Sequence, residues 1–290
     1  LTSGDGGSGS WVQNGVTGQT PSQSPAQLGG ALLNDANGNQ WALSVENESV
    51  YIFSLGPNTA SADAVMTAAI NGAASTRSTL DLGNQNINVT NDVVFPNDLP
   101  VMQGSRGAII GNGTNDLIID NAISNGRTKV FGTITLMDRA MVLRGSISNI
   151  EFHTLSSSRQ GLVIESLTSA SADRNLDNIV RGVQIGNVDD GIVFQQYGDS
   201  TTQQGNEIRV NFLSGVKDAI VFDDNSAHTS QGDWDSNLVE LQAIDNQRNN
   251  ASFLANRSNF PVNNQTIKSI SSNMSKNMGK NTHSLPIYLL

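Results

Sequence analysis

The feature that most constrains this chain is a repeat of about 30 residues in its second half. Four segments, 160–164, 190–194, 218–222 and 250–254, share a pattern of a small residue inside an apolar run. Their second positions are 161, 191, 219 and 251, so the segments recur at nearly equal intervals. A second apolar series advances at almost the same interval: Ile150, Ile179, Ile208, Val239 and Ile267. Two series that advance together indicate a stack of equivalent units.

The length of the repeat narrows the choice of architecture. About 30 residues with several short strands suit one coil of a parallel β-solenoid, whereas propeller blades need about 40 or more. The region after residue 79 has short apolar runs separated by turn residues and no second helical pattern. The sequence therefore predicts an all-β parallel β-solenoid whose coils stack about 4.8 Å apart.

Stacked coils place equivalent side chains in columns. Two inward columns are predicted, one of Leu162, Ile192 and Ile220, and another of Ile164, Phe194, Phe222 and Leu254. Strand alternation then points the residues between them outward: Val163, Val193, Val221 and Phe253. Loops of the same chain could cover these outward residues, but we favour a subunit interface. The residues themselves indicate only that the row is covered; β-solenoids of this kind often pack about a threefold axis, so a homotrimer is the expected assembly.

The first third of the chain divides into an arm and a capping helix. Residues 1–39 are rich in Gly, Ser and Gln, which predicts a flexible arm in which only Trp11 would gain much from docking. Residues 40–290 are expected to form the β-helix domain. Within it, residues 60–74 carry apolar side chains at spacings of three and four, with Asp63 near the start, and predict a helix.

Composition excludes several classes of function. A net charge of −10 disfavours binding to nucleic-acid phosphates, and no apolar run approaches the roughly 18 residues of a membrane-spanning helix. The chain has no cysteine, and its three histidines lie on distant segments. We therefore expect no disulfide, no metal site and no other cofactor.

The entry to the repeat resembles a known family. Residues 49–56 lead into the helical segment 59–74 and then into the strand-like segment 78–89, and Asn-Val-Asp-Asp-Gly-Ile at 187–192 looks like one coil. This order is similar to the pectate-lyase-like right-handed β-helix of bacteriophage tailspikes, over about residues 40–275. In that family an amphipathic helix caps the N-terminal end of the solenoid. Of the family's acidic approach to this helix, only Asp63 is present here.

The resemblance implies a place in a virion. The leading expectation is a tailspike-type protein that attaches to a host-surface polysaccharide and contacts other virion proteins through its N-terminal arm. Two alternatives are a depolymerase that hydrolyses this polysaccharide and a decoration protein that stabilises a capsid. β-Helix folds carry both enzymes and non-catalytic adhesins, so the fold alone does not decide.

Four carboxylates are the candidates for hydrolysis, which needs a pair about 5 to 9.5 Å apart. Asp190 and Asp218 occupy equivalent positions on adjacent coils, roughly 5 Å apart. Glu165 and Asp223 follow the apolar triplets, with Gln195 between them, and would lie about 9 to 10 Å apart. The alternative is that the first pair caps turns and the second is a solvated rim. We favour this non-catalytic alternative because the sequence shows no cluster of basic partners.

Three residues are candidates for contact with a glycan. Tyr197 and Trp234 lie in the long corner segments 195–204 and 223–235, and His228 precedes Trp234 in the second of them. Loops on adjacent coils could bring the three side chains over one groove. The alternative is that both rings cover loop backbone or fill a seam between subunits.

Overall fold

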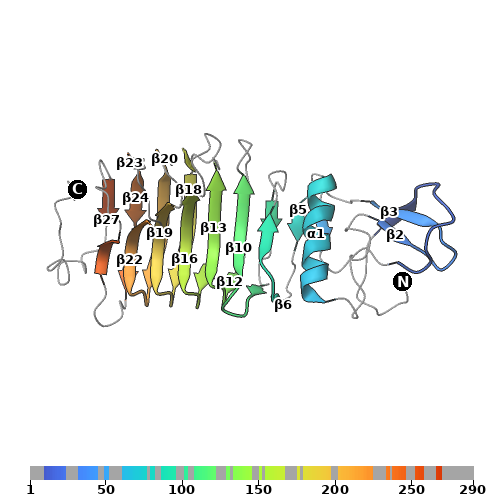
Figure 1. Ribbon diagram of the computed structural model, residues 1–290, viewed down its shortest axis with the longest axis horizontal. Coiled ribbons are helices and arrows are strands. Elements are labelled where there is room, and N and C mark those ends of the chain that lie inside the picture. Colours follow the sequence, from blue (N-terminus) through green and yellow to red (C-terminus); the bar gives the residue numbers. More distant parts are fainter. Residues whose placement is uncertain are drawn as a thin grey trace.

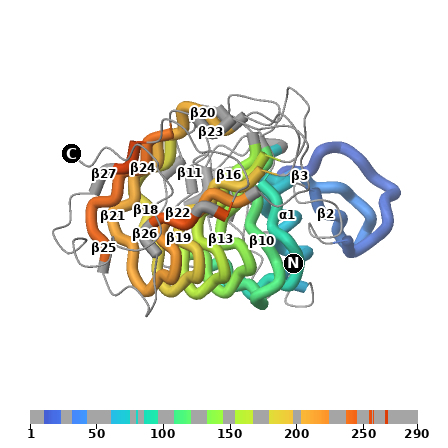
Figure 2. Tube along the Cα trace, turned by 60° about the vertical axis from the view of Figure 1, so that its left-hand side comes forward, coloured from blue at the N-terminus to red at the C-terminus, as the bar shows by residue number. Residues whose placement is uncertain are grey.

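The structure is a computed structural model. It describes residues 10–23, 32–44, 49–51, 61–76, 79–81, 86–95, 101–103, 108–121, 129–130, 133–145, 150–151, 154–166, 175–176, 179–196, 202–224, 233–235, 237–245, 252–257 and 266–269. Figure 1 shows short strands side by side along the long axis, with one helix, α1 (Ala62–Thr76), standing beside them between β5 (Thr79–Asp81) and the strands β2 (Leu32–Asn34) and β3 (Gln40–Ser44). Figure 2 shows the chain winding in successive coils.

Two long parallel sheets form most of the solenoid. The seven-stranded sheet contains β7 (Val93–Phe95), β10 (Asp116–Asn121), β13 (Arg139–Gly145), β16 (Gln160–Ser166), β19 (Asp190–Gln196), β22 (Asp218–Asp224) and β26 (Ser252–Asn256). The ten-stranded sheet contains β6 (Asn86–Asn88), β9 (Ala108–Ile110), β12 (Thr133–Thr135), β14 (Ile150–Glu151), β15 (Thr154–Ser156), β18 (Ile179–Gly186), β21 (Glu207–Ser214), β24 (Leu238–Leu241), β25 (Ile244–Asp245) and β27 (Thr266–Ser269).

Shorter sheets complete the coils. One contains β4 (Ser49–Tyr51), β5 (Thr79–Asp81), β8 (Val101–Gln103) and β11 (Lys129–Val130), and the other contains β17 (Asn175–Leu176), β20 (Thr202–Gln204) and β23 (Asp233–Asp235). The pairings within these four sheets are parallel. The predicted fold class, an all-β parallel β-helix with one helix near its start, is therefore confirmed.

The inward columns form the core. Leu162 pairs with Ile192 and Ile192 with Ile220, while Ile164 pairs with Phe194 and Phe194 with Phe222. The rings of Phe194 and Phe222 are stacked, with centroids 4.9 Å apart. The ten-stranded sheet contributes a facing row of buried residues, one from each coil: Ile87, Ile109, Ile134, Leu155, Ile185, Leu213 and Ile244. Both sheets therefore bury their inward side chains in one continuous cluster.

The coils are unequal in length. Among the pairings of the seven-stranded sheet, the coil from Met141 to Leu162 is the shortest and the coil from Ile220 to Leu254 is the longest. The predicted assignment of the last coil is wrong, because Leu254 pairs with Ile220 and not with Phe222. The second apolar series is also displaced at one point, since Val180 rather than Ile179 pairs with Ile208. Connections of variable length between the strands absorb these shifts.

The helix α1 (Ala62–Thr76) caps the N-terminal end close to the expected range of 60–74. The Ser61 hydroxyl accepts a hydrogen bond from the amide of Ala64, as an N-cap residue does. Its apolar side packs into the solenoid core through Met66, Ala69, Ile70 and Ala73.

Asp63, in the first turn of α1, does more than complement the helix dipole. Its carboxylate accepts bonds from both the amide and the hydroxyl of Thr90 and from the amide of Asn91. Burial raises the pKa of Asp63, but these bonds outweigh it and the net shift is downward. The residue therefore ties the cap to the first coils.

Part of the expected flexible arm is folded. β1 (Ser10–Gln13) and β2 (Leu32–Asn34) pair antiparallel with β3 (Gln40–Ser44). Trp11 packs against the solenoid core, as its size suggested. The composition of residues 1–39 did not predict these strands, because short apolar runs interrupt the Gly and Ser residues. Both β1 and β2 pair with β3, which lies beyond residue 39.

Candidate functional site

The outer face of the seven-stranded sheet carries two polar columns around an apolar one. The leading column lies at the strand starts and contains Asp116, Arg139, Gln160, Asp190 and Asp218. The trailing column contains Asp120, Arg144, Glu165, Gln195 and Asp223. Between them lies the outer apolar row, Ile118, Val142, Val163, Val193 and Val221, which forms a second buried cluster. Three of the four candidate catalytic carboxylates are buried members of these columns.

Arg257 joins the two acidic residues that adjacent coils bring together. Its guanidinium donates to both carboxylate oxygens of Asp190, at 2.9 and 2.7 Å, and to Asp218 at 2.5 Å. Gln160 donates a further bond to Asp190 at 3.2 Å. The pKa of Arg257 is raised because its hydrogen bond to Asp190 stabilises the cation, although partial burial acts in the opposite direction. We refer to Arg257, Asp190 and Asp218 as the arginine clamp.

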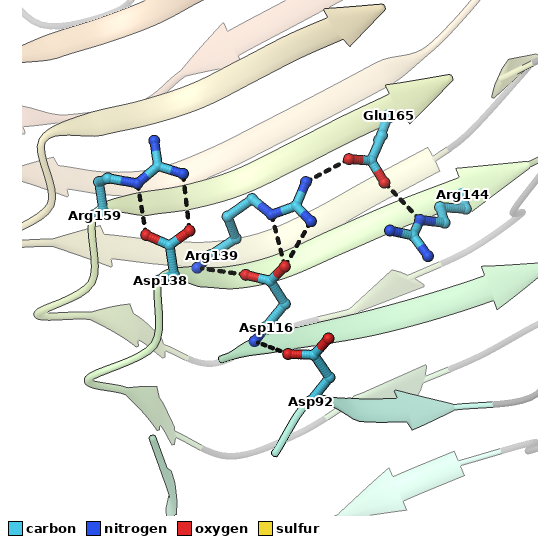
Figure 3. A network of polar contacts seen from close by, with 7 residues as sticks. All are labelled: Asp92, Asp116, Asp138, Arg139, Arg144, Arg159 and Glu165. Carbon is cyan, nitrogen blue, oxygen red and sulfur yellow. Dashed lines mark hydrogen bonds and ion pairs between the residues drawn. The ribbon is translucent and has the colours of Figure 1, made fainter. Parts of the chain in front are cut away.

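Glu165 is the centre of a second ion-paired group, which Figure 3 shows. Its side chain is 1% exposed and binds two guanidinium groups, those of Arg139 and Arg144. Arg139 also donates to Asp116 at 2.9 and 2.5 Å. Burial lowers the pKa of Arg139, but the bonds to Asp116 and the charges of both carboxylates outweigh it, so the net shift is upward. Glu165 is therefore not the solvated rim residue expected as the alternative to catalysis.

Arg159 and Asp138 form a further ion pair outside these two groups, which Figure 3 also shows. Arg159 donates to both oxygens of Asp138, at 2.6 and 2.9 Å. Half of the Arg159 side chain is exposed, so this pair contributes little to stability. Opposite charges on adjacent coils are therefore paired both in the polar columns and at the exposed Arg159.

The arrangement leaves the candidate carboxylates poorly placed for acid–base chemistry. Both oxygens of Asp190 and one of Asp218 accept bonds from the same cation, and both oxygens of Glu165 accept bonds from arginines. Asp223 is half-buried beside Gln195 in the trailing column. What the geometry provides is charge neutralisation between coils, which holds the strands in register.

Sequence reasoning missed the three arginines of these groups. Arg257 follows β26 and is far along the chain from Asp190, so no local spacing links them. Arg139 and Arg144 lie on a coil that the repeat did not include, because that coil is much shorter than those that follow it. Opposite charges at equivalent positions, as in Arg144 beside Glu165, were the available signal.

The remaining predicted contact residues fall largely outside the described residues. Tyr197 and His228 lie outside them. Trp234 belongs to β23, where its backbone pairs with Gln203 of β20, and its side chain is not described. The proposed groove over these three residues therefore stays a prediction.

The predicted interface residues do not offer an exposed apolar surface. Val163, Val193 and Val221 point outward as expected but are 0% exposed within a single chain. The row continues with Ala255, because Ala255 and not Phe253 pairs with Val221. Phe253 lies in β26, and its side chain is outside the description. Other residues of the same chain therefore cover the three valines, which was the alternative to a subunit contact.

Among the described residues, no group of three or more His, Asp or Glu side chains is arranged to hold a metal ion. Within the same part of the chain, no helical segment has both the length and the apolar character that crossing a bilayer requires.

Comparison of the chain with protein-family models, with curated proteins and with solved structures finds no match in any of the three.

Proposed function

We propose that this chain is an attachment protein of the bacteriophage tailspike type, which binds a host-surface polysaccharide without cleaving it. The single observation that carries the non-catalytic part of the proposal is the arginine clamp. The proposed location is the virion, as the resemblance of the N-terminal cap and coils to tailspikes implies. A homotrimer and contacts with other virion proteins belong to the same proposal.

Hydrolysis of a glycosidic bond needs one carboxyl group to deliver a proton and another to activate water or attack the sugar. Asp190 and Asp218 lie on adjacent coils, but both are ion-paired with Arg257. Glu165 is buried and paired with two guanidinium groups. A substrate would have to displace these arginines before either site could transfer a proton.

The fold supports attachment in a direct way. Each coil pairs with the next over both long sheets, so the surface side chains are fixed at a repeat of about 4.8 Å along the axis. Such a surface can contact several units of an extended polymer at once, and the weak contacts then add. No acid–base chemistry is required of any one residue.

The test is incubation of the purified chain with capsule and lipopolysaccharide preparations from a panel of bacteria. Retention of the protein on an immobilised polysaccharide measures binding, and a reducing-end assay on the same material measures cleavage. We expect retention on at least one preparation with no release of reducing ends. Cleavage would contradict the non-catalytic role, and absence of retention on every preparation would contradict attachment to a glycan.

A further inference from the structure

The outer face of the ten-stranded sheet carries two outward rows that contain no charged residue from β6 to β21, and the second row then continues with Asp245 of β25, which pairs with Ser214. They flank the buried isoleucine and leucine row. The first contains Asn86, Ala108, Thr133, Thr154, Gln184 and Phe212, and the second contains Asn88, Ile110, Thr135, Ser156, Gly186 and Ser214. We call these two rows the uncharged face. Its members are exposed or half-buried, in contrast to the buried outer apolar row of the seven-stranded sheet.

Phe212 is the one large apolar side chain that the first row exposes. It is 38% exposed and pairs with Gln184 on the preceding coil. A register shift in the pairing of β18 with β21 leaves Asn211 exposed beside it, and Gln242 is exposed on the following coil. An aromatic ring among amide groups can offer both an apolar surface and hydrogen-bond donors and acceptors.

The hydroxyl groups of the face lie close enough to interact with one another. Ser156 donates a hydrogen bond to the Thr135 hydroxyl at 3.2 Å. Neighbouring coils are about 4.8 Å apart, and the two rows, two positions apart on each strand, are separated by about 6.6 Å. The face is therefore an array of hydroxyl and amide groups with an aromatic side chain near one end.

Ion pairs lie at the border of this face, where Arg181 of β18 is also exposed. Arg209, earlier on β21, pairs with Glu207 at 2.5 Å and with Glu240 at 3.6 Å. From β6 to β21 the two rows add no charge of either sign, so this part of the face has no charges that could pair with those of an acidic or a basic polymer. Their chemistry instead matches a neutral ligand rich in hydroxyl groups.

We propose that the uncharged face is the polysaccharide-binding surface and that it takes a neutral glycan lying along the solenoid axis. The ring of Phe212 contacts the apolar side of one sugar ring. Gln184 and the Thr and Ser hydroxyls bond to sugar hydroxyls on successive coils. This inference rests on the proposed attachment function and adds to it the face and the charge class of the ligand.

The experiment measures binding of the full chain to immobilised dextran, galactomannan, hyaluronate and polygalacturonate. The first two polymers are neutral and the last two are acidic. The variants are Phe212→Ala and the double change Gln184→Ala with Thr154→Ala. The matched control is Val94→Ala, which also removes exposed apolar surface but lies on the outer side of β7. Circular dichroism melting of each variant establishes that the fold is retained.

We expect the wild-type chain to bind a neutral polymer and Phe212→Ala to bind it about 10-fold more weakly, with Val94→Ala unchanged. Binding that is unaffected by the Phe212 and Gln184 changes, or binding only to the acidic polymers, would contradict the proposal that the uncharged face binds a neutral glycan. Neither result would contradict attachment to a polysaccharide. Binding to none of the polymers would overturn the inference, while the bacterial preparations above decide attachment separately. Self-association that is lost in Phe212→Ala would overturn it too, by showing that the face contacts a second copy instead.

Discussion

The two long sheets share one core but differ in their outer faces. The seven-stranded sheet covers its outer apolar row within the chain and neutralises its charges through the arginine clamp and the Glu165 group. The ten-stranded sheet exposes hydroxyls, amides and Phe212 and carries no charge on its two outward rows from β6 to β21. Because the first face pairs the carboxylates of Glu165, Asp190 and Asp218 with arginines of the same chain, we infer that stability and the proposed recognition belong to different sides of the solenoid.

The core that both faces share should be the most sensitive to change. Phe222→Ala removes a fully buried ring that stacks on Phe194. It should lower the free energy of unfolding by about 3 to 5 kcal/mol, and the neighbouring coils should lose stability with it. Urea denaturation followed by far-ultraviolet circular dichroism measures the loss. An unchanged midpoint would mean that the inward face has been assigned to the wrong side chains.

A second pair of variants changes one residue on each outer face. Glu165→Gln leaves Arg139 and Arg144 without their shared carboxylate and should cost about 3 kcal/mol. Thr154→Val, at a half-buried position of the uncharged face, should change stability by less than about 0.5 kcal/mol. The same urea titration compares both with the wild type. Equal losses of unfolding free energy in the two variants would contradict the idea that the outer face of the seven-stranded sheet contributes more to stability than the uncharged face.

The corner between the faces offers a stabilising change. Leu136 is 48% exposed and has a φ of 56°, a left-handed conformation that costs a non-glycine residue roughly 1 kcal/mol or more. The equivalent corner positions on later coils are Ser157, Asn187 and Gly215, all with positive φ. Leu136→Asn should therefore raise the free energy of unfolding by about 1 kcal/mol. A decrease would show that the leucine makes a packing contact that outweighs its backbone strain.

The coils also show what sequence reasoning could and could not provide. The columns through Leu162, Ile192 and Ile220 were predictable, because similar residues recur at nearly equal spacing. The earlier coils escaped detection since they are shorter, and the last coil was placed out of register. Its Ala251 and Phe253 resemble the residues of the previous coil, but the strand pairing aligns Leu254 with Ile220.

The candidate site was less predictable than the fold. Asp190 and Asp218 were correctly placed on adjacent coils, but their partner Arg257 comes from the end of the next strand. Such long-range ion pairs depend on the lengths of the connections between strands, because these lengths decide which residues of different coils become neighbours. The uncharged face had no sequence signal of its own, because threonine, serine and asparagine are common throughout the chain.

The smallest expected effect on stability is in the N-terminal sheet of β1, β2 and β3, which belongs to neither of the two long sheets. The Asp35 carboxylate accepts bonds from the side chain and amide of Asn39, the indole of Trp41 and the amide of Asn37. These bonds, that of the Asn39 side chain first, lower the pKa of Asp35 to about 2. Because the folded-state pKa is depressed, the stabilisation is present above pH 3.8 and is lost as the pH falls through about 2.

Nuclear magnetic resonance of the Trp41 indole proton can follow this loss. Its chemical shift should titrate with a midpoint near pH 2, and Asp35→Asn should abolish the transition. A midpoint at pH 3.8 or above would mean that the turn does not hold the carboxylate in solution.

The role of the arginine clamp can be decided by following stability and activity in one variant. Asp190→Asn with Asp218→Asn keeps the side-chain shapes but removes both carboxylates that pair with Arg257. The account predicts that this variant unfolds at a lower urea concentration than the wild type. It also predicts that neither protein releases reducing ends from a host-surface polysaccharide. A wild-type chain that cleaves the polysaccharide, together with a variant that is equally stable but inactive, would show that these carboxylates are catalytic and contradict the account.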